Sequence, residues 1–239
     1  MKITFISDTH TQHKKIELPG GDILIFSGDF MGSGYRVYEA QSFLKWFSEQ
    51  PYKYKIFIAG NHDRYCENNP ELFEALVDDY VEQNVIYLKD DMIEVEGLKI
   101  YGTPWQPYFC NWAFNISDSD ILTSLYQNIP EDLDILITHC PPYNTLDKTH
   151  ITPAYYDNTV NCGEEPLGSK ELETVLSELG EHRPKIHCFG HIHGDGGNIV
   201  GLPYLTKPYP GGVCYINASV CDENYNPINK IVTIDYEKV

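Results

Sequence analysis

The chain has 239 residues, 42% of them hydrophobic and 22% charged, with a formal net charge of −18. This length accommodates one large domain, and we expect a single domain over residues 1–239. The acidic balance, with arginine only at positions 36, 64 and 183, argues against an extended nucleic-acid-binding surface, which needs clustered basic side chains. Apolar runs of about five or six residues are far shorter than the roughly 20 that cross a bilayer, so no membrane segment is expected.

Two features of the sequence indicate a cytoplasmic protein. Residues 1–5 lead directly into the first polar cluster, which leaves no room for a removable signal peptide. The seven cysteines are an odd number, and no two of them stand in a CxxC pair. We therefore expect reduced thiols rather than a disulfide framework or a zinc ribbon.

Strands and helices alternate in the first part of the chain. The apolar runs 3–7, 23–27 and 56–59 are nearly unbroken, which predicts strands that are buried on both faces. Residues 38–50 repeat apolar side chains with a period near 3.6, which predicts a helix. A second helix is expected to begin at Pro70, because proline is tolerated in the first helical turn.

A different pattern follows in the middle of the chain. Three short apolar segments, 85–88, 92–95 and 98–102, surround the turn residues Glu96 and Gly97, and this is typical of a β-hairpin. Each segment is only long enough for a short strand, so the block differs from the alternating pattern before it.

Further strands are expected at 135–138 and 186–189. Between them, a helix is predicted to start after the N-cap Ser169 and to end near Gly180. The polar segment 143–168 has little periodicity and is expected to be a functional loop.

Two more strands, 213–217 and 231–236, end the chain. The order of elements is strand and helix in alternation, then hairpin strands, then a strand–helix–strand unit, then strands. This order predicts an α/β fold, a four-layer α/β/β/α sandwich in which two mixed sheets pack face to face and the helices lie outside.

Polar residues of the metal-binding type follow five of the predicted strands directly. Such residues at the ends of neighbouring strands meet at one edge of a sheet, so we expect them to form one site. In chain order they are Asp8, His10, Asp29, Asn61, His139, His191 and His193.

The chemistry of this set points to metal ions and to a phosphorylated substrate. Two carboxylates, one amide oxygen and four imidazoles are too many ligands for one ion, and they suit two divalent ions that share a carboxylate. The absence of cysteine favours Mn, Fe or Zn in a catalytic site over a structural zinc site. Two such ions leave the pocket positive, so a phosphoryl group is the expected guest, attacked by a hydroxide that bridges the ions.

His62 and Asp63 follow Asn61 directly and are the expected catalytic residues. His62 is not needed as a ligand, so it is free to protonate the leaving oxygen, and Asp63 is expected to orient the ring of His62 through the other ring nitrogen. A single Asp or His after a strand is more often a turn or cap residue, and only the joint pattern favours function.

The remaining histidines and several other residues have competing interpretations. His182, in a surface turn, and His187, inside a strand, are expected to be structural, whereas His13 and His150 either are structural or line the pocket. Arg64 either contacts a phosphate or forms a solvent-facing ion pair. A group of aromatic residues forms either a base-stacking wall or, as we favour for most of them, part of the core: Trp105, Tyr108, Phe109, Trp112 and Phe114.

Taken together, the motifs resemble the calcineurin-like metallophosphoesterases over the whole chain. The family's order and spacing are matched by Asp8-x-His10, Gly28-Asp29, Gly60-Asn61-His62-Asp63, His139 and Gly190-His191-x-His193. GNHD followed by GHxH is the specific part of this match, whereas DxH alone is weak. The stretches 102–107, 112–115 and 217–219 are similar to a small single-domain branch that includes the metallophosphoesterase-domain-containing brain proteins.

The resemblance implies a role for each matching residue. It assigns Asp8, His10 and His193 to a first metal, with Asp29 bridging, and it assigns His62 as the catalytic histidine. The second metal would be held by Asn61, His139 and His191. The chain departs from many relatives in carrying Phe30-Met31-Gly32 after the GD pair, where they have an acidic or polar residue, and we expect this to affect the pocket rather than the metals.

We therefore expect a dinuclear, metal-dependent hydrolase with manganese, iron or zinc. The branch is associated with phosphodiester hydrolysis, so the expected activity is that of a phosphodiesterase, and the expected partner is a small, nucleotide-like phosphorylated substrate. The alternatives are a phosphomonoesterase or protein phosphatase, and a non-catalytic metal-binding scaffold. The intact His62 argues against the scaffold.

Overall fold

The computed structural model describes residues 1–149, 166–201 and 212–237. The first sheet has the strand order β13-β1-β2-β3-β4. Its strands are β1 (Lys2–Ile6), β2 (Gly21–Ser27), β3 (Tyr52–Ile58), β4 (Val85–Tyr87) and β13 (Val232–Asp235). The second sheet has the order β11-β12-β10-β9-β6-β5. Its strands are β5 (Asp91–Val95), β6 (Leu98–Thr103), β9 (Ile135–Thr138), β10 (Ile186–Phe189), β11 (Ile199–Val200) and β12 (Cys214–Asn217). A small third sheet pairs β7 (Gln106–Pro107) with β8 (Asn115–Ile116).

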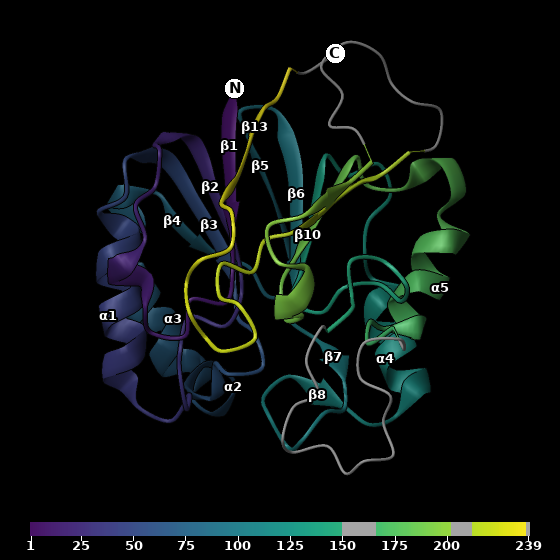
Figure 1. Ribbon diagram of the computed structural model, residues 1–239, viewed down its shortest axis with the longest axis horizontal. Helices are drawn as coiled ribbons and strands as arrows, with labels where there is room; N and C mark the ends of the chain where they lie inside the picture. Colours follow the sequence, from purple (N-terminus) through teal and green to yellow (C-terminus); the bar gives the residue numbers. More distant parts are fainter. Residues whose placement is uncertain (150–165, 202–211, 238–239) are drawn as a thin grey trace.

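Helices cover the outer face of each large sheet (Figure 1). Beside the first sheet lie α1 (Val37–Ser48), α2 (Arg64–Asn68) and α3 (Pro70–Asp78), and beside the second lie α4 (Ser119–Tyr126) and α5 (Lys170–Glu178). Short 3-10 helices are η1 (His13–Lys15), η2 (Val81–Gln83), η3 (Gly180–His182) and η4 (His193–Asp195). The predicted α/β/β/α sandwich is confirmed.

Strand β2 shows why the layers form. Ile23 and Ile25 belong to the apolar cluster between the two sheets, whereas Leu24 and Phe26 belong to the cluster under α1, where they meet Phe43. All five side chains are fully buried. Successive side chains of a strand point to opposite faces, so a strand covered on both faces must be apolar throughout. This is the physical reason for the unbroken apolar runs in the sequence.

The predicted helix ends also agree with the structure. Pro70 is the first residue of α3, and the hydroxyl of Ser169 accepts a hydrogen bond from the Leu172 N–H at the start of α5. Gly180, with a φ of +57°, follows the end of α5. Most of the predicted functional loop 143–168 lies outside the described residues.

The prediction for the middle block is wrong at one strand. β5 and β6 form the expected antiparallel hairpin around Glu96 and Gly97. The segment that begins at Val85 instead forms β4, which pairs in parallel with β3 in the first sheet. The chain therefore crosses from one sheet to the other between β4 and β5.

Two general features of the described residues bear on the expected class of protein. None of their helices has the length and apolar character needed to cross a membrane. Their cysteines, which exclude Cys162, are free thiols.

Candidate metal centre

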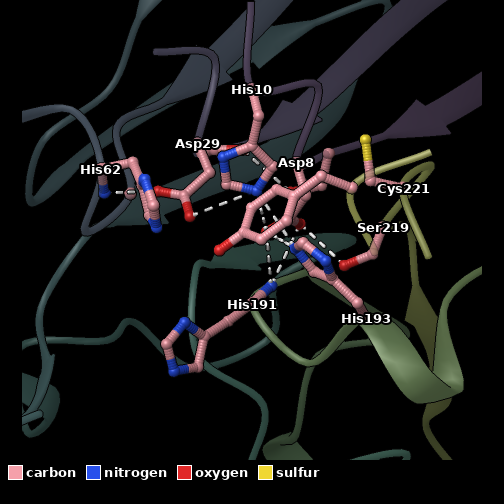
Figure 2. Close-up of polar contacts among 12 residues, drawn as sticks. Asp8, His10, Asp29, His62, His191, His193, Ser219 and Cys221 are labelled. Carbon is pink, nitrogen blue, oxygen red and sulfur yellow. Dashed lines mark hydrogen bonds and ion pairs between the residues drawn. The ribbon is translucent and has the colours of Figure 1, made fainter. Parts of the chain in front are cut away.

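The structure brings the seven predicted ligands together at the carboxyl ends of strands from both sheets. Each one follows its strand within a few residues: β1 for Asp8 and His10, β2 for Asp29, β3 for Asn61, β9 for His139, and β10 for His191 and His193. Figure 2 shows Asp8, His10, Asp29 and His193 pointing toward one another. In three overlapping groups, the potential ligand atoms lie within 4.8 Å of one another: Asp8, His10 and His193; Asp8, Asp29 and His139; and His10, Asp29 and His62.

Sharp turns after the strands aim these side chains at a common point. Asp8, His10, Asp29 and His191 all have positive φ, between 42° and 67°. This left-handed backbone is sparsely populated for residues other than glycine and costs about 1–3 kcal/mol at each position. Backbone hydrogen bonds from Asp8 N–H to the Gly28 carbonyl (2.9 Å) and from His10 N–H to the Asp29 carbonyl (3.1 Å) hold the turns in place. Other non-glycine residues of the described chain also have positive φ, so this backbone explains how the side chains are aimed and does not by itself mark the site.

Two motif glycines leave space for neighbouring ligands. A Cβ atom at Gly60 would lie 2.4 Å from Oδ1 of Asp29, and one at Gly190 would lie 2.1 Å from Oδ2 of Asp8. Contacts this short require the atoms to move, so a side chain at either position would displace a carboxylate. The glycines of GNHD and GHxH are therefore explained by close packing around Asp29 and Asp8.

Backbone carbonyls set the orientation of three imidazoles. The Nδ1–H groups of His62, His139 and His193 donate to the carbonyls of Gly32 (2.6 Å), Ser27 (2.8 Å) and Asp222 (2.9 Å). A carbonyl can only accept a hydrogen bond, so each Nδ1 carries a proton and each Nε2 is left to face the site. This arrangement of ring and carbonyl is common for metal-binding histidines.

The remaining donor atoms approach one another closely in two places. Nε2 of His10 lies 3.1 Å from Nε2 of His193. Oδ1 of Asn61 lies 2.8 Å from both Nε2 of His139 and Nδ1 of His191. Two ring nitrogens at 3.1 Å repel each other unless a proton or a cation lies between them.

The two carboxylates are buried and surrounded by histidines. Among the described residues, the ion pairs of Asp8 and Asp29 are all with histidine. Burial opposes the ionisation of Asp8, but its hydrogen bond and charge interaction with His193 outweigh burial and lower the pKa of Asp8. The charge of His139 has the same effect on the buried Asp29, and the pKa of Asp29 lies well below its ordinary value. Both groups are therefore anionic near neutral pH.

The imidazoles differ in protonation. Burial lowers the pKa of both His10 and His191 to about 3, so their rings are neutral near pH 7 and keep a lone pair. Burial also acts on His139, but the charge of Asp29 outweighs it and raises the pKa of His139 to about 9. Buried carboxylates next to the neutral rings of His10 and His191 and an amide oxygen fit divalent cations that accept mixed nitrogen and oxygen ligands.

The prediction that Asp63 orients the ring of His62 is wrong. Nδ1 of His62 is bonded to the Gly32 carbonyl, and the buried carboxylate of Asp63 accepts hydrogen bonds from three backbone N–H groups: those of Asp29 (2.8 Å), Met31 (2.9 Å) and Gly60 (2.7 Å). Burial and the nearby charge of Asp29 raise the pKa of Asp63, and the N–H groups of Gly60 and Met31 oppose the rise. Asp63 therefore joins the loops after β2 and β3 and does not touch the ring.

Two residues of the site, Ser219 and Tyr225, were not assigned to it from the sequence, and Trp112 was weighed as part of either an aromatic wall or the core. The hydroxyl of Ser219 donates to Oδ2 of Asp8 (2.7 Å), the ring of Trp112 stacks on His62 with centroids 4.1 Å apart, and the ring of Tyr225 lies 4.7 Å from that of His10. Ser219 and Trp112 lie in stretches that carried the family resemblance, which was the available signal. Tyr225 lies in a polar loop without a periodic pattern.

Other residues with competing interpretations are now placed. His13 is buried, lies 3.1 Å from the Ser42 hydroxyl and packs against Trp46, so it is structural. His187 is buried in β10, and His182 is exposed beside Asp132. His150 lies outside the described residues. Among the aromatic residues, Phe114 belongs to a core cluster and the partly buried Trp105 packs against it, whereas Tyr108 and Phe109 are exposed.

Comparisons with known proteins agree with this geometry. A family model described as calcineurin-like phosphoesterase matches residues 1–195. The chain is 36% identical to metallophosphoesterase domain-containing protein 1 of Homo sapiens, in an alignment that covers 96% of this chain and 69% of that protein, and the Mus musculus protein of the same name gives the same values. It is also 32% identical to a UPF0046 protein of Caenorhabditis elegans, over 98% of this chain and 60% of that protein. The chain therefore belongs to the calcineurin-like phosphoesterase family.

Proposed function

We propose that this protein is a phosphodiesterase that binds two divalent metal ions and hydrolyses a nucleotide-sized phosphodiester. Its family consists of metal-dependent phosphoesterases, so the proposal concerns the kind of ester, the number of ions and the residues involved. The observation that carries it is the convergence of seven nitrogen and oxygen donors in one site, with the ring of His62 beside them.

The donor atoms support two neighbouring metal positions. Asp8, His10 and His193 form one group, and Asn61, His139 and His191 form a second through the Asn61 oxygen. Asp29 lies next to both, because its Oδ2 is 3.9 Å from Nε2 of His10 and 3.4 Å from Nε2 of His139. When bound, manganese, iron or zinc ions supply Lewis-acid polarisation of the phosphoryl oxygens and activation of the attacking water.

We assign to His62 the transfer of a proton to the leaving oxygen. Its backbone N–H donates to Oδ1 of Asp29 (2.7 Å) and its Nδ1–H donates to the Gly32 carbonyl (2.6 Å). These two bonds fix one side of the residue and leave Nε2 facing the donor cluster. A proton held at Nε2 is therefore next to the place where a phosphoryl group would lie.

The charges around the site favour a diester over a monoester. A monoester carries up to two negative charges and is commonly held by additional arginine side chains. Here Arg64 follows the GNHD motif directly, and its guanidinium lies over the rings of Trp112 and Tyr35. Because this cation already lies on aromatic rings, a singly charged diester suits the site better.

Aromatic side chains around the donor cluster support a substrate with a flat group. Tyr225 lies near His10, Trp112 lies on His62, and the ring of Phe109 is 6.2 Å from that of His191. Tyr225 and Phe109 are exposed. A nucleobase stacks on such surfaces with about 1–3 kcal/mol per base.

The proposal predicts that hydrolysis depends on added metal and prefers diesters. The metal-stripped protein should be inactive, and Mn²⁺ should restore cleavage of bis-p-nitrophenyl phosphate more strongly than cleavage of p-nitrophenyl phosphate. Preference for the monoester would replace the proposed activity with that of a phosphomonoesterase. Bound metal without cleavage of either ester would favour a scaffold.

Two variants separate the metal ligands from the catalytic histidine. Asp29→Asn keeps the size of the side chain and the left-handed backbone that asparagine tolerates, but it removes the charge between the two positions, so metal content and activity should both fall. His62→Ala should keep the metals and slow turnover by roughly 10²–10⁴. Metal content by atomic spectroscopy and turnover under saturating Mn²⁺ check both results. Full activity of Asp29→Asn would exclude this assignment.

A further inference from the structure

Trp112 covers the ring of His62. Their ring centroids are 4.1 Å apart and their planes are inclined by 26°, which is a stacked arrangement. The neighbours of Trp112 in the chain behave differently, since Ala113 and Phe114 are buried in the core cluster under α1. Trp112 is partly exposed and packs on a polar ring, so apolar burial alone does not explain its position.

The segment that carries Trp112 is tied to the loop after β3 and to α2 by several hydrogen bonds. Ala113 N–H donates to the Asn61 carbonyl (3.0 Å), and Phe114 N–H donates to Oε1 of Glu67 (2.8 Å). The Arg64 guanidinium donates to the Asn111 carbonyl (3.1 Å), immediately before Trp112. These bonds place Trp112 and His62 at a fixed separation, because both ends of the contact belong to one hydrogen-bonded unit.

The guanidinium group of Arg64 also contacts the indole ring of Trp112. Its Cζ atom lies 4.2 Å from the centroid of the Trp112 ring and 4.7 Å from that of Tyr35. Cation–π contacts of this kind contribute about 0.5–2 kcal/mol each, depending on desolvation. Tyr35, Arg64, Trp112 and His62 therefore form a continuous stack, and its first member is supplied by the loop after β2, two residues before α1.

The stack and the hydrogen bond at Nδ1 constrain the imidazole in complementary ways. The bond to the Gly32 carbonyl restrains Nδ1, but a hydrogen bond tolerates a range of donor angles, so some rotation of the ring about the Cβ–Cγ bond remains. Contact with the flat indole fixes the plane of the ring. Together they determine where Nε2 points.

We propose that Trp112 is a positioning residue that sets the plane of the His62 ring, so that Nε2 is aimed at the leaving oxygen of the substrate. This rests on the proposed function. In the step concerned, water forms a new P–O bond and the P–O bond to the leaving group breaks. The leaving oxygen keeps the electron pair and takes the proton from Nε2, and the attacking water releases one proton that restores the protonated His62. Aim at the leaving oxygen matters most when that oxygen is a poor leaving group, because a good one departs without a proton.

The test compares two diesters with different leaving groups, methyl p-nitrophenyl phosphate and methyl phenyl phosphate, under saturating Mn²⁺. Trp112→Leu should lose roughly 10- to 100-fold in kcat on the phenyl ester and less than about threefold on the p-nitrophenyl ester. The larger loss is a part of the roughly 10²–10⁴ that a positioned general acid contributes to the rate. KM should change little for either ester. Trp112→Phe, which restores a flat ring, should recover most of the loss. Trp105→Leu is the matched control, since Trp105 is partly buried against the core cluster under α1 and its indole N–H donates to Asp90, and its two rates should change in parallel.

A spectroscopic measurement on the metal-free protein checks the contact without reference to activity. The ring current of an indole stacked at this distance shifts the imidazole proton resonances of His62 upfield, and Trp112→Leu should abolish this shift while Trp105→Leu leaves it unchanged. Equal losses on both esters, or unshifted His62 resonances in the parent protein, would overturn the positioning role. If the parent protein binds metal but cleaves neither ester, the proposed function itself fails. If the parent is active and Trp112→Leu lowers both rates equally, only the positioning role of Trp112 fails.

Discussion

Ser219 shows how a residue outside the proposed ligand set can control a proposed ligand. Its buried hydroxyl donates to Oδ2 of Asp8 (2.7 Å), and the backbone N–H of His191 lies 3.0 Å from the same oxygen. These bonds fix the rotation of the carboxylate. Hydrogen bonds of this kind commonly contribute 10- to 100-fold to metal affinity.

We therefore predict that Ser219→Ala weakens metal binding by roughly 10- to 100-fold. Titration of the metal-stripped protein with Zn²⁺ against a chromogenic chelator measures the change. Ser48→Ala is the matched control, since that hydroxyl is bonded to the Lys45 carbonyl on α1, far along the chain from the ligands. An unchanged affinity in Ser219→Ala would show that Asp8 needs no such support, or that it is not a ligand.

At the scale of single residues, the sequence predicted which residues gather at the site, but it did not predict every contact that they make there. The seven candidate ligands could be recognised because each follows an apolar run, and the end of a strand places its next residues at the sheet edge. Asp63 could not be interpreted in this way. Adjacency to His62 suggested a partnership, but the turn after β3 directs the Asp63 carboxylate toward backbone N–H groups and the His62 ring toward Gly32.

At the scale of elements, Asp63 is the link between the loops that follow β2 and β3. Its carboxylate accepts from the N–H groups of Asp29, Met31 and Gly60, and the side chain is fully buried. In Asp63→Asn, one of the accepting oxygens becomes an NH₂ group that faces a backbone donor. A buried donor without an acceptor costs about 1–3 kcal/mol, and more when it replaces a charged acceptor.

We predict that Asp63→Asn lowers the free energy of unfolding by about 2–3 kcal/mol and also reduces activity, because Asp29 and Asn61 depend on the same loops. Urea unfolding followed by circular dichroism gives the first quantity, and turnover of the diester gives the second. Asp78→Asn, at the exposed end of α3, supplies the control. Parent-like stability of Asp63→Asn would mean that the loops are held by other contacts.

The elements themselves were largely predictable, because burial on two faces and helix caps leave local signals. The assignment of a short strand to one of two sheets leaves none. The sequence of β4 fits an edge strand of either sheet, and its pairing with β3 is set by the crossover that α3 makes before it. The position of Trp112 was also beyond prediction, since it depends on hydrogen bonds between two loops rather than on the period of any element.

At the scale of the whole molecule, the last part of the chain closes the site across both sheets. β12 lies in the second sheet and β13 in the first, and the connection between them carries Ser219, Asp222 and Tyr225. Ser219 also pairs with Ser7 through an isolated parallel β-bridge, and Ser7 directly precedes Asp8, the first of the proposed ligands. The family match ends at residue 195, so these contacts with Asp8, His193 and His10 come from a segment outside the matched region.

The stability of the whole fold should also depend on pH through His187, in the middle of the second sheet. Its Nε2 lies 2.9 Å from the Thr138 hydroxyl, which itself donates to the Cys140 carbonyl, so Nε2 carries the proton and donates. Nδ1 is buried without a hydrogen-bond partner in the described part of the chain. Burial therefore lowers the pKa of His187 from 6.5 to about 3.

The sign of the effect follows from where the proton binds. Below pH 6.5 the unfolded chain takes up a proton at His187 that the folded protein does not, so this stabilisation is fully present above pH 6.5 and is lost as the pH falls toward 3. Between about pH 7.5 and about pH 5.5 the loss from this one group is about 1.4 kcal/mol. His187→Gln keeps a donor for the Thr138 hydroxyl but cannot titrate. Between these two pH values, the free energy of unfolding of the variant should therefore fall by about 1.4 kcal/mol less than that of the parent.

Urea unfolding of the metal-stripped proteins at the two pH values measures the difference, since the other buried histidines contribute equally to both. His182→Gln is the control, because Asp132 raises the pKa of that exposed histidine and its replacement cannot relieve a loss of stability in acid. The same pH dependence in His187→Gln and in the parent would place the proton uptake elsewhere. A flatter dependence in His187→Gln alone would identify this buried histidine of the second sheet, which is not one of the proposed ligands, as one cause of a loss of stability in acid.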